Sequence, residues 1–234
     1  MLSNPKTARN GNILAAVGMV AAILATIFLH EGEVNTIIYG LIFGAIALGT
    51  IVGWLTAKRV QMTKMPELVS LFNGMGGACA ALIGLVEFHH NLDNSTNIAI
   101  ILAGMIIGSV SFSGSIIAWA KLNGTLRNAI RLPKYNILNT IILIGLVVYS
   151  VFIVWSGTHS EAHLYGLFTA AIIYGILFVI PIGGADMPVV ISLLNSFTGI
   201  TAALTGIIFN NNVMLLGGIL VGAAGTILTV LMCE

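Results

Sequence analysis

Charged residues are scarce in this chain of 234 residues, where aspartate, glutamate, lysine and arginine together make up only 7%. Hydrophobic residues make up 58%, and the mean hydropathy is +1.04. A globular domain in water carries roughly 25% charged residues, so this composition excludes a water-soluble protein. Lipid must therefore surround most of the chain.

Cysteines are few, and a signal-peptide cleavage site is lacking. The chain has two cysteines, Cys79 inside one apolar stretch and Cys233 at the end of another. Because their sulfurs are expected at different depths in a reducing environment, we predict two free thiols and no disulfide. The first apolar stretch has no small-residue cleavage pattern, so we expect a retained helix and no signal peptide.

Long apolar runs take the place of charge. A membrane-spanning helix needs about 20 mainly apolar residues. Eight such stretches nearly exhaust the sequence, at about 12–29, 35–57, 66–88, 97–120, 136–155, 162–181, 187–209 and 212–233. The sequence therefore predicts an all-α fold, a polytopic membrane bundle of about eight transmembrane helices.

The few charges are segregated between the loops. All basic residues lie before the first stretch or in the second and fourth connections, at Lys6, Arg9, Lys58, Arg59, Lys64, Lys121, Arg127, Arg131 and Lys134. The alternate loops carry all five histidines and the acids Glu31, Glu33, Glu87, Asp93 and Glu161. Since basic loops face the cytoplasm, we predict that the N- and C-termini are both cytoplasmic.

One pattern of nine residues occurs twice. Residues 65–73 read Met-Pro-Glu-Leu-Val-Ser-Leu-Phe-Asn, and residues 187–195 read Met-Pro-Val-Val-Ile-Ser-Leu-Leu-Asn. Proline in a first helical turn costs no hydrogen bond, so we place both methionines just outside their helix starts. Both copies begin at a predicted cytoplasmic loop. This predicts a parallel internal repeat of four plus four helices, with halves at about 1–120 and 121–234.

Each copy carries an asparagine about two helical turns below its start. At 1.5 Å per residue, Asn73 and Asn195 are expected on the order of 10 Å inside the membrane. An unpaired amide is costly there, so each needs a partner or water. Two interpretations stay open: the amides join helices as structural hydrogen bonds, or they line a polar pathway.

Small and hydroxyl residues recur within the predicted helices. Four glycine pairs have the spacing that lets helix backbones approach closely: Gly40 with Gly44, Gly49 with Gly53, Gly104 with Gly108, and Gly218 with Gly222. A denser polar patch contains Ser109, Ser111, Ser113 and Ser115. These hydroxyls either bond to carbonyls of their own helix or line a wet cavity.

Asp186 is the only acid in its short predicted cytoplasmic loop, directly before the second repeated helix. A helix N-terminus favours a carboxylate, so Asp186 is either an N-cap acid or a titratable or docking residue at the mouth of a pathway. The first copy has Lys64 at the equivalent position. The two helix starts therefore differ in charge.

Three other patterns carry no predicted site. The glycine run at 74–77 lacks the preceding strand that a phosphate-binding loop requires. The histidines of the alternate loops are interpreted first as solvated interfacial residues, with metal binding or proton collection as the alternative; they are His89 and His90, and His159 and His163 with Glu161. The basic connection from Lys121 to Lys134 is a topology signal and a potential lipid contact, and its charge is too small for nucleic-acid binding.

Several motifs together resemble the membrane domain of the β subunit of proton-translocating NAD(P) transhydrogenase. They are Gly-Gly-Ala-Asp-Met-Pro-Val-Val at 183–190, Ser192 with Asn195 and Ser196, Met-Pro-Glu-Leu-Val at 65–69, and Phe-Ser-Gly-Ser at 112–115. The resemblance covers essentially the whole chain.

The resemblance implies an oxidoreductase and translocase complex of the bacterial cytoplasmic (inner) membrane. Such a complex couples hydride transfer between NADH and NADP⁺ to proton movement, and this domain would supply the proton path. No cofactor is expected on this chain. NAD(H) would bind the α subunit, and NADP(H) a soluble β-subunit domain after the last span.

Partners and chain ends are also implied by the resemblance. The expected partners are the α subunit with its membrane helices, the NADP-binding domain, the lipid bilayer and a second αβ unit in a dimer. The soluble NADP-binding domain is absent from this chain, and family members usually begin with one more span. We therefore expect a chain trimmed at both ends or a variant architecture.

The resemblance also assigns residue roles. Asn73 matches a proposed proton-transfer position that is histidine in many members and asparagine in others. Because an amide does not titrate near pH 7, Asn73 is expected to position water or donate a hydrogen bond. Ser115 and Asn195 match polar channel positions, and Asp186 matches a loop acid that couples to the NADP domain. No hydride-transfer residue and no metal ligand is expected.

Two other functions compete with this one. Parallel repeats and polar residues within spans are equally natural in a stand-alone secondary transporter. A structural membrane scaffold would use the asparagines only to join helices.

Overall fold

The computed structural model describes residues 5–28, 35–90, 95–126, 134–157 and 160–233. Several residues used for the topology prediction lie outside these ranges, among them Glu31, Glu33, Asp93, Arg127, Arg131 and His159. The regular structure of the described residues consists of α1 (Pro5–Phe28), α2 (Thr36–Arg59), η1 (Met62–Lys64), α3 (Met65–His90), α4 (Ser95–Leu122), α5 (Tyr135–Ser156), α6 (Glu161–Val179), η2 (Gly184–Asp186), α7 (Met187–Ile208) and α8 (Asn212–Cys233). Within this part of the chain, eight helices are long and apolar enough to cross a membrane, which confirms the predicted fold class.

Both repeated helices start in the same way. A single 3₁₀ turn, η1 or η2, leads directly into α3 or α7. The helices therefore begin at Met65 and Met187 themselves, and placing these methionines outside the helices was wrong by one residue. The prolines that follow them still fall in the first turn, where no hydrogen bond is lost.

The chain forms two compact units, Met1–Arg59 and Val60–Glu234. In the first unit, α2 has no buried residue. Side chains added at its four glycines, Gly40, Gly44, Gly49 and Gly53, would meet nothing within 4 Å. The close helix contact predicted for these glycines is therefore not seen within this unit. The division into halves near residue 120 is not tested by these units and stays a prediction.

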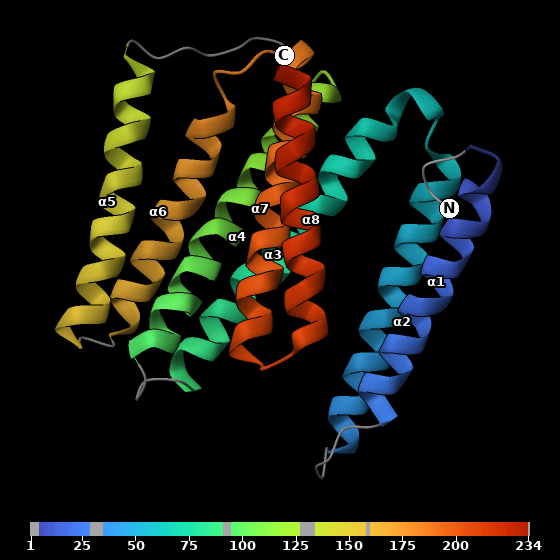
Figure 1. Cartoon of the computed structure of the whole chain (residues 1–234), viewed down its shortest axis with the longest axis horizontal. Helices are drawn as coiled ribbons and strands as arrows, with labels where there is room; N and C mark the ends of the chain where they lie inside the picture. Colours follow the sequence, from blue (N-terminus) through green and yellow to red (C-terminus); the bar gives the residue numbers. More distant parts are fainter. Residues whose placement is uncertain (1–4, 29–34, 91–94, 127–133, 158–159, 234) are drawn as a thin grey trace. The chain divides into compact units, whose positions relative to one another are not determined.

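In the second unit, α4 contacts α3, α5, α6 and α7, and Figure 1 shows it (green) running among them. Most of its length is buried, in contrast to α5 and α8. Apolar side chains from α3 to α6 form a core cluster that includes Phe88, Ile101, Met105, Leu146 and Leu167. Because lipid tails are as apolar as these side chains, tight packing rather than escape from water holds this cluster together.

The internal repeat is visible in two helix pairs. Ser70 of α3 donates its hydroxyl to the carbonyl oxygen of Ser115 in α4, at 2.8 Å. Its repeat equivalent in α7, Ser192, donates to the carbonyl of Gly225 in α8, at 3.1 Å. Thus α3 packs on α4 in the same register as α7 packs on α8.

Glycines make the same close contacts in both pairs. A Cβ at Gly77 would stand 2.8 Å from the carbonyl oxygen of Gly108, and one at Gly199 would stand 3.0 Å from that of Gly218. These backbones approach so closely that only glycine fits without displacement. The predictions for the Gly104–Gly108 and Gly218–Gly222 segments are therefore confirmed at Gly108 and Gly218.

Candidate intramembrane polar site

A polar cluster lies where α3, α4 and α7 meet. We call it the Asn73 cluster; it contains Asn73, Ser111, Ser115, Thr198 and the carbonyl of Leu194. The Asn73 amide donates from Nδ2 to Ser115 Oγ at 3.0 Å and, over a longer 3.5 Å, to Ser111 Oγ. Ser111 Oγ lies 2.7 Å from Thr198 Oγ1 and 3.0 Å from the Leu194 carbonyl oxygen. Three helices thus share one hydrogen-bonded network.

The network offers more hydrogen-bond contacts than it has protons to fill. Thr198 Oγ1 also lies 3.1 Å from the Leu194 carbonyl oxygen, so two hydroxyls and one carbonyl are mutually in contact. Ser111 and Thr198 have one hydroxyl proton each, so only two of these three contacts are occupied at once. The hydroxyls can therefore exchange between arrangements without moving a helix.

The cluster lies well inside the helices. Asn73 is eight residues after the start of α3, which corresponds to about 12 Å at 1.5 Å per residue. Ser115 is seven residues before the end of α4, or about 10 Å. Ser111 and Ser115 are buried and Asn73 is half-buried. At this depth a polar group needs a partner, and the network supplies one for the Asn73 amide nitrogen and for the hydroxyls of Ser111 and Ser115.

The serines of α4 divide into two kinds. Ser109 donates to the carbonyl of Met105 at 2.6 Å, and Ser113 donates to that of Ser109 at 2.9 Å. These two satisfy their own helix, as one of the two interpretations expected. Ser111 and Ser115 instead make contacts between helices.

Asn195 is not part of the Asn73 cluster. Its side chain is exposed and lines a groove of about 370 Å³ together with Val69, Ser192 and Gly225. Among the described residues its amide has no hydrogen-bond partner. The reason is a difference between the repeats: the α8 position equivalent to Ser115 is Gly225, which offers no hydroxyl. The structure brings Asn73 and Ser115 together and leaves Asn195 apart.

Asp186 occupies the N-cap position of α7, but its side chain makes no capping hydrogen bond. The carboxylate is exposed at the end of η2. The position agrees with the N-cap interpretation, which required no capping hydrogen bond. A docking role stays a prediction.

Thr198 is the cluster residue that the sequence did not reveal. Its repeat equivalent is Gly76, and a Cβ at Gly76 would stand 3.2 Å from Thr198 Cγ2. Equivalent positions of the two copies therefore meet where α3 and α7 touch. Because the first copy has glycine at this position, the repeat gives no sign of a polar residue here. The one sequence signal for Thr198 is its place one helical turn after Asn195.

The glycine run at 74–77 and His163 have structural roles outside the Asn73 cluster. In the glycine run, Gly74 and Gly77 are buried within α3 against α4, so their backbone is engaged in helix packing and offers no phosphate-binding loop. His163 is half-buried, with Nδ1 at 2.6 Å from the Tyr149 hydroxyl. No group of three or more potential metal ligands occurs in the described ranges.

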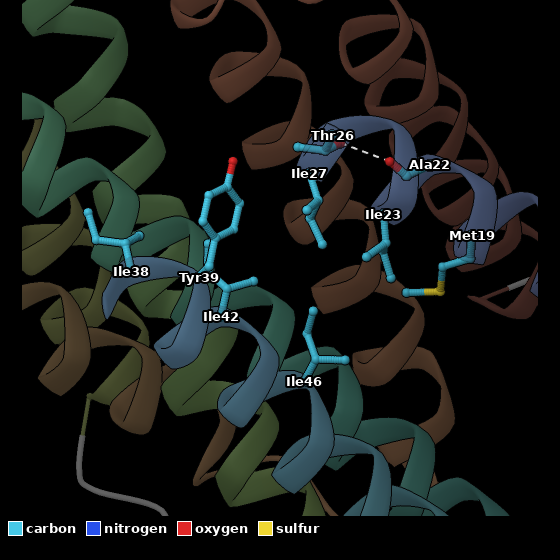
Figure 2. Close-up of a pocket in the computed structure, with 9 residues that line it drawn as sticks. All are labelled: Met19, Ala22, Ile23, Thr26, Ile27, Ile38, Tyr39, Ile42 and Ile46. Carbon is cyan, nitrogen blue, oxygen red and sulfur yellow. Dashed lines mark hydrogen bonds between the residues drawn. The ribbon is translucent and has the colours of Figure 1, made fainter. Parts of the chain in front are cut away.

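A second cavity lies between α1 and α2. This groove of about 650 Å³ is lined mainly by isoleucines from both helices, as Figure 2 shows. The Thr26 hydroxyl donates to the carbonyl of Ala22 in its own helix, at 2.9 Å. Among the lining residues, only Tyr39 carries a further polar side-chain group. The groove is suited to apolar contact, and the Asn73 cluster is the better candidate for polar chemistry.

The fold and the cluster define a multi-pass helical membrane protein with a polar site inside its bundle. A sequence model of the family described as NAD(P) transhydrogenase beta subunit matches residues 1–234, and the chain therefore belongs to this family. It is similar to the NAD(P) transhydrogenase subunit beta of Rhodospirillum rubrum, with 37% identity over 243 residues. The same subunit from a named strain of that organism matches equally. The alignment covers 100% of this chain and 51% of each relative, so the chain spans about half their length.

Proposed function

We propose that this chain is the proton-translocating membrane domain of a transhydrogenase, coupling proton movement to hydride transfer between NADH and NADP⁺. The observation that carries the proposal is the Asn73 cluster, a hydrogen-bonded chain of an amide and hydroxyls inside a family member's membrane bundle. Hydroxyl groups donate and accept at once, so such a chain passes a proton when its members reorient in turn. Because no member titrates near neutral pH, we assign proton uptake and release to neighbouring water or a partner helix.

The proposal includes a placement in the cell. Exposed basic residues precede α3 in the sequence, at Lys58, Arg59 and Lys64. By the positive-inside rule we assign the N-terminal end of α3, and with it both chain termini, to the cytoplasm of a bacterium. The NADP-binding domain would then follow α8 on the cytoplasmic side, and the α subunit would supply membrane helices and the NAD-binding domain. The nicotinamide nucleotides, which carry the hydride, would bind those domains.

The proposal is tested by reconstituting the whole complex in vesicles and measuring hydride transfer and internal pH together. We expect a fixed number of protons moved per hydride transferred. Hydride transfer without proton movement in the unmodified complex would overturn the proposal. Substrate-dependent flux by this chain alone would instead favour a secondary transporter.

Asp186→Asn is expected to lower coupled activity without loss of stability. The Asp186 carboxylate is exposed and makes no capping bond, so the thermal midpoint should change little. Proton flux and hydride transfer should fall together about fivefold or more, since coupling between sites is typically worth roughly 1–3 kcal/mol. Glu67→Gln, which alters an acid in the first turn of α3, is the matched control. Equal activity of the two variants would remove Asp186 from the coupling path.

Asn195→Leu is expected to lower proton flux about threefold to fivefold, because one net hydrogen bond is worth about 1 kcal/mol. The unpartnered amide faces the groove between α3, α7 and α8, where water or a partner helix can reach it. Leucine keeps the branching at Cγ and removes the polar group. Asn136→Leu, at an exposed position in the first turn of α5, is the control. Unchanged proton flux with Asn195→Leu would restrict the path to the Asn73 cluster.

A further inference from the structure

Lys121 is a buried cation at the end of α4. It is 8% exposed, whereas the other described lysines and arginines with assigned exposure, Arg9, Lys58, Arg59, Lys64 and Lys134, are exposed. A lysine that only marks the cytoplasmic side needs no burial, because an ammonium is more stable in water or at lipid headgroups. Burial of Lys121 therefore calls for a local cause.

The cause is the segment that follows α6. Lys121 Nζ donates to the carbonyl oxygens of Val179 at 3.0 Å and Ile182 at 2.5 Å, and also to that of Ile180. An ammonium has three N–H donors, so each one is occupied. The last carbonyls of a helix lack partners within it and carry partial negative charge, which favours a cation here. Lys121 thus holds the end of α6 and the start of the connection to α7.

This contact joins two parts of the proposed mechanism. On α4, Ser115 of the Asn73 cluster lies six residues before Lys121, about 9 Å along the helix axis. Along the other chain segment, Asp186 lies four residues after Ile182. The helix α4 therefore carries hydroxyls of the Asn73 cluster and, near its end, Lys121, which anchors the loop that leads to Asp186.

We propose that Lys121 is a positioning residue that ties the loop 180–186 to α4, so that a shift of α4 at the Asn73 cluster is transmitted to Asp186. This inference rests on the proposed function and names the element that links the membrane site to the nucleotide domain. Lys121 touches no substrate and moves no proton. It sets where the coupling carboxylate is presented.

The test compares Lys121→Met with Lys121→Arg in the whole complex. Methionine keeps the apolar stem but has no donor, so all three carbonyls lose the ammonium, and only that of Val179 keeps another donor, the backbone N–H of Ile182. Arginine keeps the charge and several donors. A nitroxide label on Ala185→Cys, an exposed loop position, reports loop motion in a background without other cysteines. Lys134→Met, at an exposed lysine, is the matched control.

We expect Lys121→Met to increase label mobility and to lower proton flux and hydride transfer together about fivefold, as Asp186→Asn should, because this is the usual scale of coupling between sites. Lys121→Arg should retain at least half of the wild-type flux, and Lys134→Met should match the wild type. Unchanged label mobility with Lys121→Met, or Arg variants as impaired as Met variants, would overturn the inference. If the Met variant does not assemble, Lys121→Gln replaces it, and failure of both to assemble would show a purely structural lysine.

The label separates this inference from the proposed function. If the unmodified complex moves no protons, the proposed function fails, while the mobility of the label still tests whether Lys121 holds the loop. If protons move but the label does not respond to Lys121→Met, the function stands and the link through Lys121 fails.

Discussion

Asn73→Leu is expected to lower proton flux in the reconstituted complex about tenfold or more, the scale on which losing one or two buried hydrogen bonds acts. Leucine branches at Cγ as asparagine does but has no donor. Ser115 Oγ would lose its 3.0 Å bond and Ser111 Oγ its longer one. The hydroxyl chain to Thr198 would then be cut off from α3. Hydride transfer should fall with proton flux, because the two are coupled.

The control for this prediction separates function from stability. Asn73→Leu removes interhelical bonds, so the thermal midpoint of the purified complex is measured beside the flux. A lower midpoint with unchanged flux per intact complex would support the structural interpretation of the amide. Asn73→His restores a donor and adds a group that titrates near neutral pH. We expect this variant to retain flux and to make it depend on pH between about 5 and 8.

The lengths of the helices were predictable because the bilayer sets them. A hydrocarbon layer of about 30 Å requires about 20 apolar residues, whatever their neighbours. The predicted stretches therefore overlap the eight helices of the described residues, and they differ only at their ends, most of all where α1 begins at Pro5 and the predicted stretch begins at about residue 12. The dense run of serines in the fourth stretch also predicted that Ser111 and Ser115 belong to one polar patch.

The neighbours of each side chain were not predictable in the same way. Asn73 and Asn195 occupy equivalent positions in the repeat, and the sequence treats them alike. Their surroundings differ because α4 presents serine where α8 presents Gly225. Which helix packs on which decides whether an amide is bonded or faces a groove, and two like apolar helices give no signal for that choice.

Lys121 illustrates the same limit for charge. In the sequence it belongs to a basic connection that indicates topology and a potential lipid contact. In the structure its ammonium is buried against three backbone carbonyls, which no side-chain pattern announces. Backbone acceptors at a helix end are present in every sequence. Only the meeting of α4 with the end of α6 makes these particular carbonyls the partners of a lysine.

The close contact between α7 and α8 predicts a large effect on stability. Gly199 lies buried in this contact, and a Cβ there would stand 2.5 Å from the backbone nitrogen of Gly222 and 3.0 Å from the carbonyl oxygen of Gly218. Backbone atoms of a helix cannot turn aside as a side chain does. Gly199→Ala therefore forces the two helices apart along the seam that also holds the bond from Ser192 to Gly225.

We expect Gly199→Ala to destabilise the bundle by about 1–3 kcal/mol, the range for overpacking, and to lower the thermal midpoint of the purified complex. Gly217→Ala is the matched control on α8, because a Cβ at Gly217 meets nothing within 4 Å. Alanine is the better helix former, so without the steric conflict both substitutions would stabilise. A rise in the midpoint with both variants would show that α7 and α8 do not meet at Gly199. A fall with Gly199→Ala alone places the second repeat pair as the structure has it.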